Sequence, residues 1–168
     1  VSVSETVDLL SYETVEVGPD PGLTTTTQYD MNGQVTAILE DFLDPQGVPQ
    51  SYVTASTYNP EFQMDSRTIP SGATETWTYA SEGLVATHVD PSGVLREWTY
   101  GPNSQVAESR EGGEVIETTT FDADDLPVEI YRGDGTLKRR VTYDADGLML
   151  SMENGTGQIV QFTYDGGY

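Results

Sequence analysis

The chain has 168 residues, of which 28 are acidic and 7 basic, and its formal net charge is −21. A surface this negative repels nucleic acid phosphates and anionic lipid head groups, and no apolar run reaches the roughly 18 residues of a membrane span. We therefore expect no nucleic acid partner and no membrane insertion. The absence of cysteine excludes disulfides and thiolate metal sites.

Residues 1–28 precede the periodic part of the chain. Residues 1–4 and 14–17 alternate like strands, and the Pro- and Gly-rich segment 18–22 separates them from 24–27. Because arrays of repeats need capped ends, we interpret 1–28 as an N-terminal strand or cap segment. The alternative is a detachable strand that pairs with another subunit. A start at Val1 rather than Met is typical of a processed secreted chain, and equally of a piece of a longer one.

Residues 29–168 carry a repeat of about 21 residues. Seven aromatic residues recur at gaps of 29, 21, 21, 21, 22 and 21 residues, and four of them are followed by Asp. A fixed period of this size indicates one structural unit stacked on copies of itself, here about seven times. The predicted repeat residues, with the turn glycines, are Tyr29, Asp30, Gly33, Tyr58, Tyr79, Gly83, Tyr100, Phe121, Asp122, Tyr143, Asp144, Gly147, Tyr164 and Asp165.

Residues 79–100 show what one repeat contains. A turn at 81–83 leads to a predicted strand at 84–89, and a second strand at 94–100 is rich in β-branched and aromatic residues. Between them, Asp90-Pro91-Ser92-Gly93 has the preferences of a type I turn with a left-handed exit at Gly93. Turn signals recur every 10 or 11 residues, so we expect two strands and two turns per repeat and almost no helix.

Alternation along the second strand of each repeat predicts which side chains share a face. The residue two before each aromatic lies on its face, and in four repeats this is Trp77, Trp98, Val141 or Phe162. The opposite face is polar and carries Glu97, Thr99, Lys138, Arg140, Gln161 and Thr163. The sheet must therefore curl, or find a partner, to cover its apolar side.

The fold class predicted is all-β: one domain, an antiparallel meander of hairpins forming a twisted, coiled ribbon or partial barrel. A closed β-propeller is the main rival, and it is disfavoured because a blade needs four strands and about 40 residues.

The segment Tyr143-Asp144-Ala145-Asp146-Gly147-Leu148, with its copies over residues 29–168, resembles the YD repeat of bacterial Rhs and wall-associated proteins, toxin-complex shells and teneurins. The resemblance implies a long antiparallel β-ribbon that spirals, in large members, into a hollow shell around a cargo. This chain departs from those members because it has only about seven repeats and no recognisable C-terminal cargo domain. Their paired Asp-Pro-x-Gly-Leu cleavage signature is echoed here only by residues 90–94.

The sequence does not single out an enzyme site. His88 is the only histidine, and with 28 acidic residues no carboxylate pair is distinctive. We therefore expect no catalytic residue and no cofactor. Calcium at 144–147 or 122–125 is the alternative, but Gly147 stands fourth, where a β-turn requires it, rather than sixth as in an EF-hand.

Two features are compatible with carbohydrate. Asn154-Gly155-Thr156 is an N-glycosylation sequon placed on a predicted turn. Trp77 and Trp98 could stack on sugars. Packing against the repeat aromatics on the same face of the sheet, which we call the aromatic ladder, explains them more simply.

The function predicted is a non-catalytic extracellular or cell-surface structural module that self-assembles through its open strand ends, with itself as partner, end to end in a filament. Two alternatives stay open. One is a carbohydrate-binding adhesion module with surface glycans as partner, and the other is a fragment of a larger toxin-encapsulating Rhs-type shell.

Overall fold

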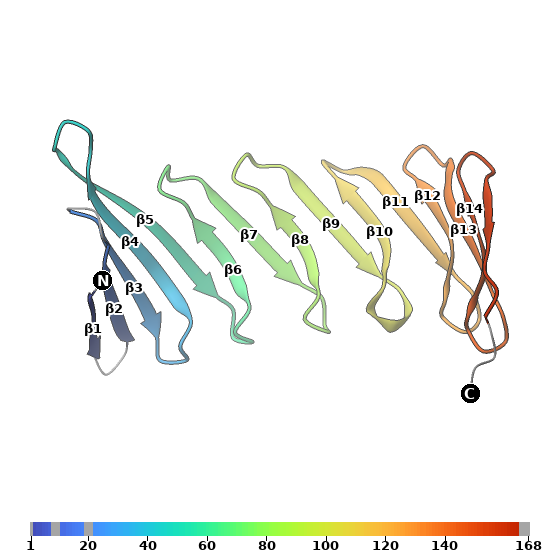
Figure 1. Ribbon diagram of the computed structural model, residues 1–168, viewed down its shortest axis with the longest axis horizontal. Coiled ribbons are helices and arrows are strands. Elements are labelled where there is room, and N and C mark those ends of the chain that lie inside the picture. The colour runs from blue at the N-terminus through green and yellow to red at the C-terminus, as the bar shows by residue number, and fades with distance from the viewer. Residues whose placement is uncertain (1, 8–10, 19–21, 165–168) are drawn as a thin grey trace. The chain divides into compact units, whose positions relative to one another are not determined.

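The computed structural model describes residues 2–7, 11–18 and 22–164. Over these residues the chain forms fifteen strands and one 3-10 turn, with no α-helix, and the strand order in the sheet is the order of the sequence. Every register that is resolved is antiparallel, which confirms the predicted all-β meander (Figure 1). No helix within the described ranges is long and apolar enough to cross a membrane.

The chain divides into two compact units. The first contains Val1–Thr78 with Val89–Gly93, and the second contains Tyr79–His88 with Val94–Tyr168. This suits the repeat architecture, because each described strand forms its backbone pairing with its sequence neighbours alone.

The first unit is a meander of hairpins. Strand β2 pairs residue by residue with β3, and residue 28, where we placed the end of the N-terminal segment, lies inside β3. The Tyr12 and Tyr29 rings stack across this pair with centroids 4.5 Å apart. The strands are β1 Ser2–Val7, β2 Ser11–Val17, β3 Thr24–Asp30, β4 Val35–Leu43, β5 Pro49–Tyr58, β6 Met64–Thr68 and β7 Thr74–Tyr79.

The second unit continues the same pattern. It keeps the two-strand, two-turn repeat, and its one irregular connection is the 3-10 turn η1, Pro102–Ser104, which follows Tyr100. The strands are β8 Val85–Val89, β9 Leu95–Tyr100, β10 Val106–Glu111, β11 Glu114–Phe121, β12 Pro127–Arg132, β13 Leu137–Tyr143, β14 Met149–Asn154 and β15 Ile159–Gln161.

A β-bulge recurs beside the repeat aromatic. The register shifts by one residue next to Tyr29, Tyr58, Tyr100, Phe121 and Tyr143. A bulge bends the strand and increases its right-handed twist, so these five repeats share the same local distortion.

Very little of the described chain is buried. Ile130 and Val141 are the only buried hydrophobic side chains among the described residues, at 8% and 6% exposure. Val141 is one of the predicted ladder residues, whereas Trp77, Trp98 and Phe162 are half-buried. Within the part of the chain that the structure describes, no second layer covers the aromatic side of the sheet.

Candidate functional site

The repeat turns share one hydrogen-bonding pattern. At residues 44–48 the Asp44 N–H donates to the Val48 carbonyl over 3.0 Å, and the Gly47 N–H donates to the Asp44 carbonyl over 2.8 Å. The Asp44 carboxylate accepts the N–H groups of Gln46 and Val48 at 2.9 and 2.8 Å. The same side-chain cap forms at Asp30, Asn59, Asp122, Asp144 and Asn154.

These bonds explain the Asp of the predicted motif. A side-chain oxygen that accepts two backbone N–H groups holds the turn closed. At Asp30, the N–H groups of Gln34 and Asn32 lower the pKa of the carboxyl below its usual value, because they stabilise the charged form. Asp165 lies outside the described residues.

The left-handed position of the turn is filled mostly by glycine. Gly33, Gly83 and Gly147 have φ of +81°, +78° and +79°, as their predicted role requires. Phe62 and Asp125 occupy the equivalent place at +64° and +63°. A bulky residue at positive φ is strained, so Phe62 is a genuine exception to the repeat.

Each of these two exceptions is bound by the turn of the preceding repeat. The Gln34 side-chain amide donates to the Phe62 carbonyl at 2.7 Å, and that of Gln105 donates to the Asp125 carbonyl at 3.1 Å. Both glutamines directly follow the left-handed position of their own turn. Each glutamine side chain therefore links its own turn to a neighbouring turn at the residue whose backbone is strained.

Four repeat tyrosines close the open end of their own hairpin through the hydroxyl group, which reaches the first residue of the preceding strand. Tyr58, Tyr100, Tyr143 and Tyr164 donate to the carbonyls of Val35, Val85, Pro127 and Met149 at 2.8, 2.6, 3.0 and 2.9 Å. Each acceptor stands two residues after the left-handed position of the preceding repeat. Phe121 lacks the hydroxyl, and its equivalent acceptor would be the carbonyl of Val106.

The tyrosine hydroxyls lie close to the preceding acidic turn. Burial raises the pKa of Tyr58 and of Tyr143, and the negative charges of Asp30 and Asp122 raise them further. The aromatic and the Asp of successive repeats thus meet in one cluster. We interpret this cluster as structural, because the tyrosine hydroxyls and the Asp carboxylates in it form hydrogen bonds to the backbone of the sheet.

Ion pairs account for five of the basic residues. Four of the five bind across strands, and Arg110 pairs within its own strand, β10. Arg67 pairs with the buried carboxylate of Glu75 and lies over the Trp77 ring, 6.0 Å from its centroid. In the second unit Arg140 bridges β12, β13 and β14 by bonding Glu129 at 2.8 Å and Glu153 at 3.2 Å. The other pairs are Arg96–Glu111, Arg110–Glu108 and Lys138–Glu117.

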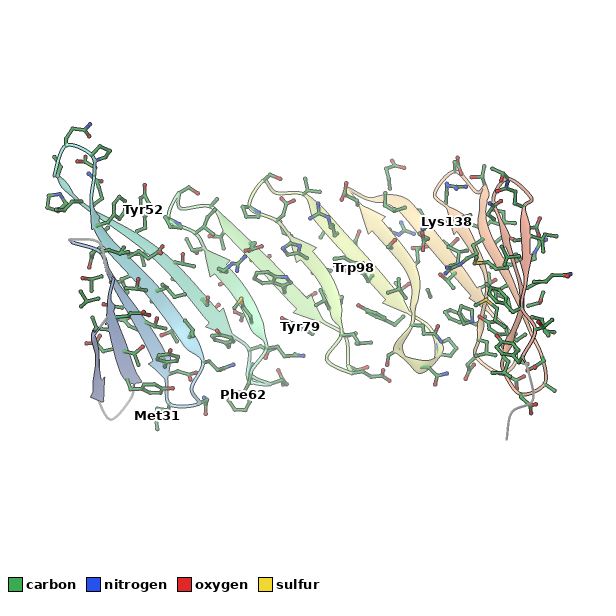
Figure 2. All side chains as sticks on the ribbon, in the orientation of Figure 1. Met31, Tyr52, Phe62, Tyr79, Trp98 and Lys138 are labelled. Carbon is green, nitrogen blue, oxygen red and sulfur yellow. The ribbon has the colours of Figure 1, made fainter. Side chains whose placement is uncertain are left out.

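The first unit holds a groove of about 460 Å³ between the turns at 30–34 and 59–63. Its wall combines hydroxyl, amide and carboxylate groups with the ring of Phe62, which is 59% exposed. Figure 2 shows Phe62 at the β5–β6 turn. The lining residues are Asp30, Asn32, Gln34, Thr36, Ser56, Thr57, Tyr58, Asn59, Pro60 and Phe62.

The second unit holds a groove of about 340 Å³ at the corresponding place in its repeat, beside the turn at 80–84. Trp98 and Tyr100 line it, together with Glu82 and Leu84. Trp98 therefore borders a groove as well as standing on the aromatic face, whereas Trp77 packs with Arg67.

The remaining predicted sites lie as follows. Within the described residues, no group of three or more His, Asp or Glu side chains is arranged to hold a metal ion. The Asn154 amide donates to the side chain of Gln158 at 2.9 Å while its oxygen caps the turn. A glycan on Asn154 would have to displace the first of these bonds, and glycosylation there stays a prediction.

Phe62 and the long β4–β5 hairpin are the features that sequence reasoning missed. The signal for the first was Asn59, which caps like Asp and places Phe62 three residues later. The signal for the second was the gap of 29 residues between Tyr29 and Tyr58.

No protein-family model matches the chain, and no curated protein matches it. Among solved structures, a crystal structure of TcdB2–TccC3 with Cdc42 aligns with 80% of this chain at 13% identity and a TM-score of 0.39. A crystal structure of TcdB2–TccC3 and a Photorhabdus luminescens Tc holotoxin pore each align with 97% at 12% identity, with TM-scores of 0.38 and 0.35. The chain spans 9% of the first of these chains and 13% of the other two.

Proposed function

We propose that the chain is a non-catalytic structural module, a section of single-layer β-sheet in which each hairpin is the template for the next strand. The observation that carries this proposal is the linear strand order combined with an almost unburied sheet. The joints between repeats are local and repeated, as suits a sheet that grows by adding units.

The free edge of β15 is suited to such growth. Val160 pairs with Met152 of β14, and the Phe162 N–H donates to the Leu150 carbonyl at 2.9 Å. By alternation, the Gln161 N–H between them points away from β14, where the described residues provide no strand. A further strand would pair there, either as the next repeat of a longer chain or from another copy.

Assembly between copies joins two different edges, because β1 and β15 differ in sequence. Such a contact is heterologous and propagates as a ring or filament. The net charge of −21 opposes it at low salt, and screening permits it as ionic strength rises. We also propose that the protein lies outside the cell or on its surface, as part of a larger Rhs-type shell or wall. The resemblance to YD repeats supports this location.

The test compares edge variants by sedimentation at high salt. We expect the intact chain to form large assemblies, and Gln161→Pro to remain small because proline removes the outward N–H without touching the β14 bonds. Deletion of residues 1–10 should have the same effect from the other edge. Ala145→Pro is the matched control, since it recreates the Asp-Pro turn of residues 90–91. Assemblies that survive both edge changes would exclude strand addition.

A second candidate is carbohydrate binding in the groove of the first unit. It is favoured by the strained and exposed Phe62 beside a wall of hydroxyl and amide groups, since aromatic faces stack on sugars and strain concentrates at functional positions. Phe62→Gly should relieve the strain, leave the fold intact and abolish binding on a glycan array. If no glycan binds the intact chain, or Phe62→Gly binds equally well, this candidate is wrong.

A further inference from the structure

The β4–β5 hairpin is longer than the 21-residue repeat requires. Tyr29 and Tyr58 stand 29 residues apart where the other gaps are 21 or 22. The excess lengthens β4 to 9 and β5 to 10 residues, against 5 and 6 in the next hairpin, β6–β7. Figure 1 shows this hairpin reaching beyond the β6–β7 turn within the first unit.

One edge of the extension has no strand beside it among the described residues. The pairing of β5 with β6 ends at Ala55↔Thr68, and the chain turns at Ile69. Residues 49–54 therefore pair with β4 alone. The opposite edge is occupied, since β3 pairs with β4 as far as Thr24↔Asp41 and Gly22 lies against Leu43.

Alternation identifies the backbone groups that the open edge presents. The Asp44 N–H donates to the Val48 carbonyl, so the next bonded pairs down the hairpin are Phe42↔Gln50 and Glu40↔Tyr52. Ser51 and Val53 lie between them and point their N–H and C=O groups away from β4. Ala55, the next residue in that series, is the first to pair with β6.

The side chains around this edge are apolar and acidic. Tyr52 is 51% exposed and Val53 44%, and the Tyr52 ring contacts that of Phe42 with centroids 4.9 Å apart. On β4, Glu40 lies across from Tyr52 and Asp41 across from Ser51. Residues 1–66 contain no Lys, Arg or His, so nothing in this part of the chain balances these acids.

We propose that the open edge of β5 at Ser51–Val53 binds, by β-strand addition, an extended segment of another protein that alternates basic and apolar residues. Backbone pairing supplies the affinity, and the neighbouring acids select a basic strand. At low salt, where the peptide is tested, a second copy of this chain is a poor occupant, because the two copies repel each other with a charge of −21 each.

The probe is a short blocked peptide of alternating lysine and valine, with the glutamate–valine peptide as its control, titrated into the full chain by calorimetry. The lysine peptide should bind at low salt, weaken as salt rises, and slow hydrogen exchange at the amides of Ser51 and Val53. Ser51→Pro removes one outward N–H and should weaken binding by about tenfold or more. Gln161→Pro, on the edge of β15, should leave binding unchanged.

A second variant protects the test against misfolding of Ser51→Pro. Removing residues 40–43 and 49–52 together restores the 21-residue spacing, preserves alternation and keeps the turn at 44–48, so the fold should persist while binding is lost. Three results would overturn the proposal: equal binding of the glutamate peptide, loss of binding in Gln161→Pro but not in Ser51→Pro, or a self-associated form of the chain that only Ser51→Pro disrupts. The last of these would identify a second copy as the occupant.

Discussion

At the scale of single residues, the left-handed backbone position of each repeat turn decides whether that turn can form. The turn needs φ near +80°, which glycine adopts without strain and which Phe62 and Asp125 adopt at a cost. The glutamine side chains that bind these two carbonyls show how the surrounding structure compensates.

Replacing Gly147 by valine should lower the free energy of unfolding by about 1 to 3 kcal/mol, because a β-branched residue is strained at φ +79°. Gly147→Asn is the matched control and should cost less, since asparagine tolerates this conformation. Urea unfolding measures both. Equal stability of the valine variant and the intact chain would show that Gly147 is not held in the left-handed conformation.

Acid should weaken the turns that a carboxylate supports. The hydroxyl and N–H of Thr136, with the positive charge of Arg132, lower the pKa of Asp134. A carboxyl whose folded pKa lies below its unfolded value of about 3.9 stabilises the protein above that pH and loses this contribution as pH falls through the folded pKa. Asp134→Asn should therefore be less stable than the intact chain at neutral pH, and the difference should vanish in acid.

The control for this comparison is Asp146→Asn, which removes a charge from another turn and reports the general effect of a smaller net charge. Thermal unfolding at neutral and acidic pH measures all three proteins. A difference between Asp134→Asn and the intact chain that is the same at every pH would contradict the account.

At the scale of elements, four tyrosine hydroxyls each tie the end of a hairpin's second strand to the start of its first. Phe121 is the exception, and Phe121→Tyr should restore a bond to the Val106 carbonyl. We expect a gain of about 0.5 to 1.5 kcal/mol in the free energy of unfolding, the usual contribution of one hydrogen bond. Tyr143→Phe should lose a similar amount. If Phe121→Tyr leaves the free energy of unfolding unchanged or lowers it, the tyrosine hydrogen bond cannot be transferred from one repeat to another.

The sequence predicted these elements because their signals are local. Asp90-Pro91-Ser92-Gly93 and Tyr143-Asp144 specify turn and strand within a few residues, and the structure places Gly93 at φ +86° as expected. The open edge at Ser51–Val53 was not predictable in the same way, because it depends on where β6 ends. Nor did alternation reveal that Lys138 pairs with Glu117, two strands away. The register shift in the pairing of β12 with β13 lies beside Leu137, where simple alternation fails.

At the scale of the whole molecule, stability comes from many small joints rather than from a core. Two buried hydrophobic residues among those described contribute little, whereas turn caps, tyrosine bonds and cross-strand ion pairs recur in both units. A protein built in this way can lengthen without redesign, since each new hairpin brings its own contacts. The same property leaves open strand edges, and we propose that these accept further strands.

The most direct test of this account is hydrogen exchange at the Gln161 amide of the intact chain in high salt, over a range of protein concentrations. If the sheet grows by strand addition, this outward N–H should exchange quickly in dilute protein and slowly once copies associate, because it then donates to a new strand. If assemblies form while the Gln161 amide still exchanges as fast as in dilute protein, the central claim is contradicted.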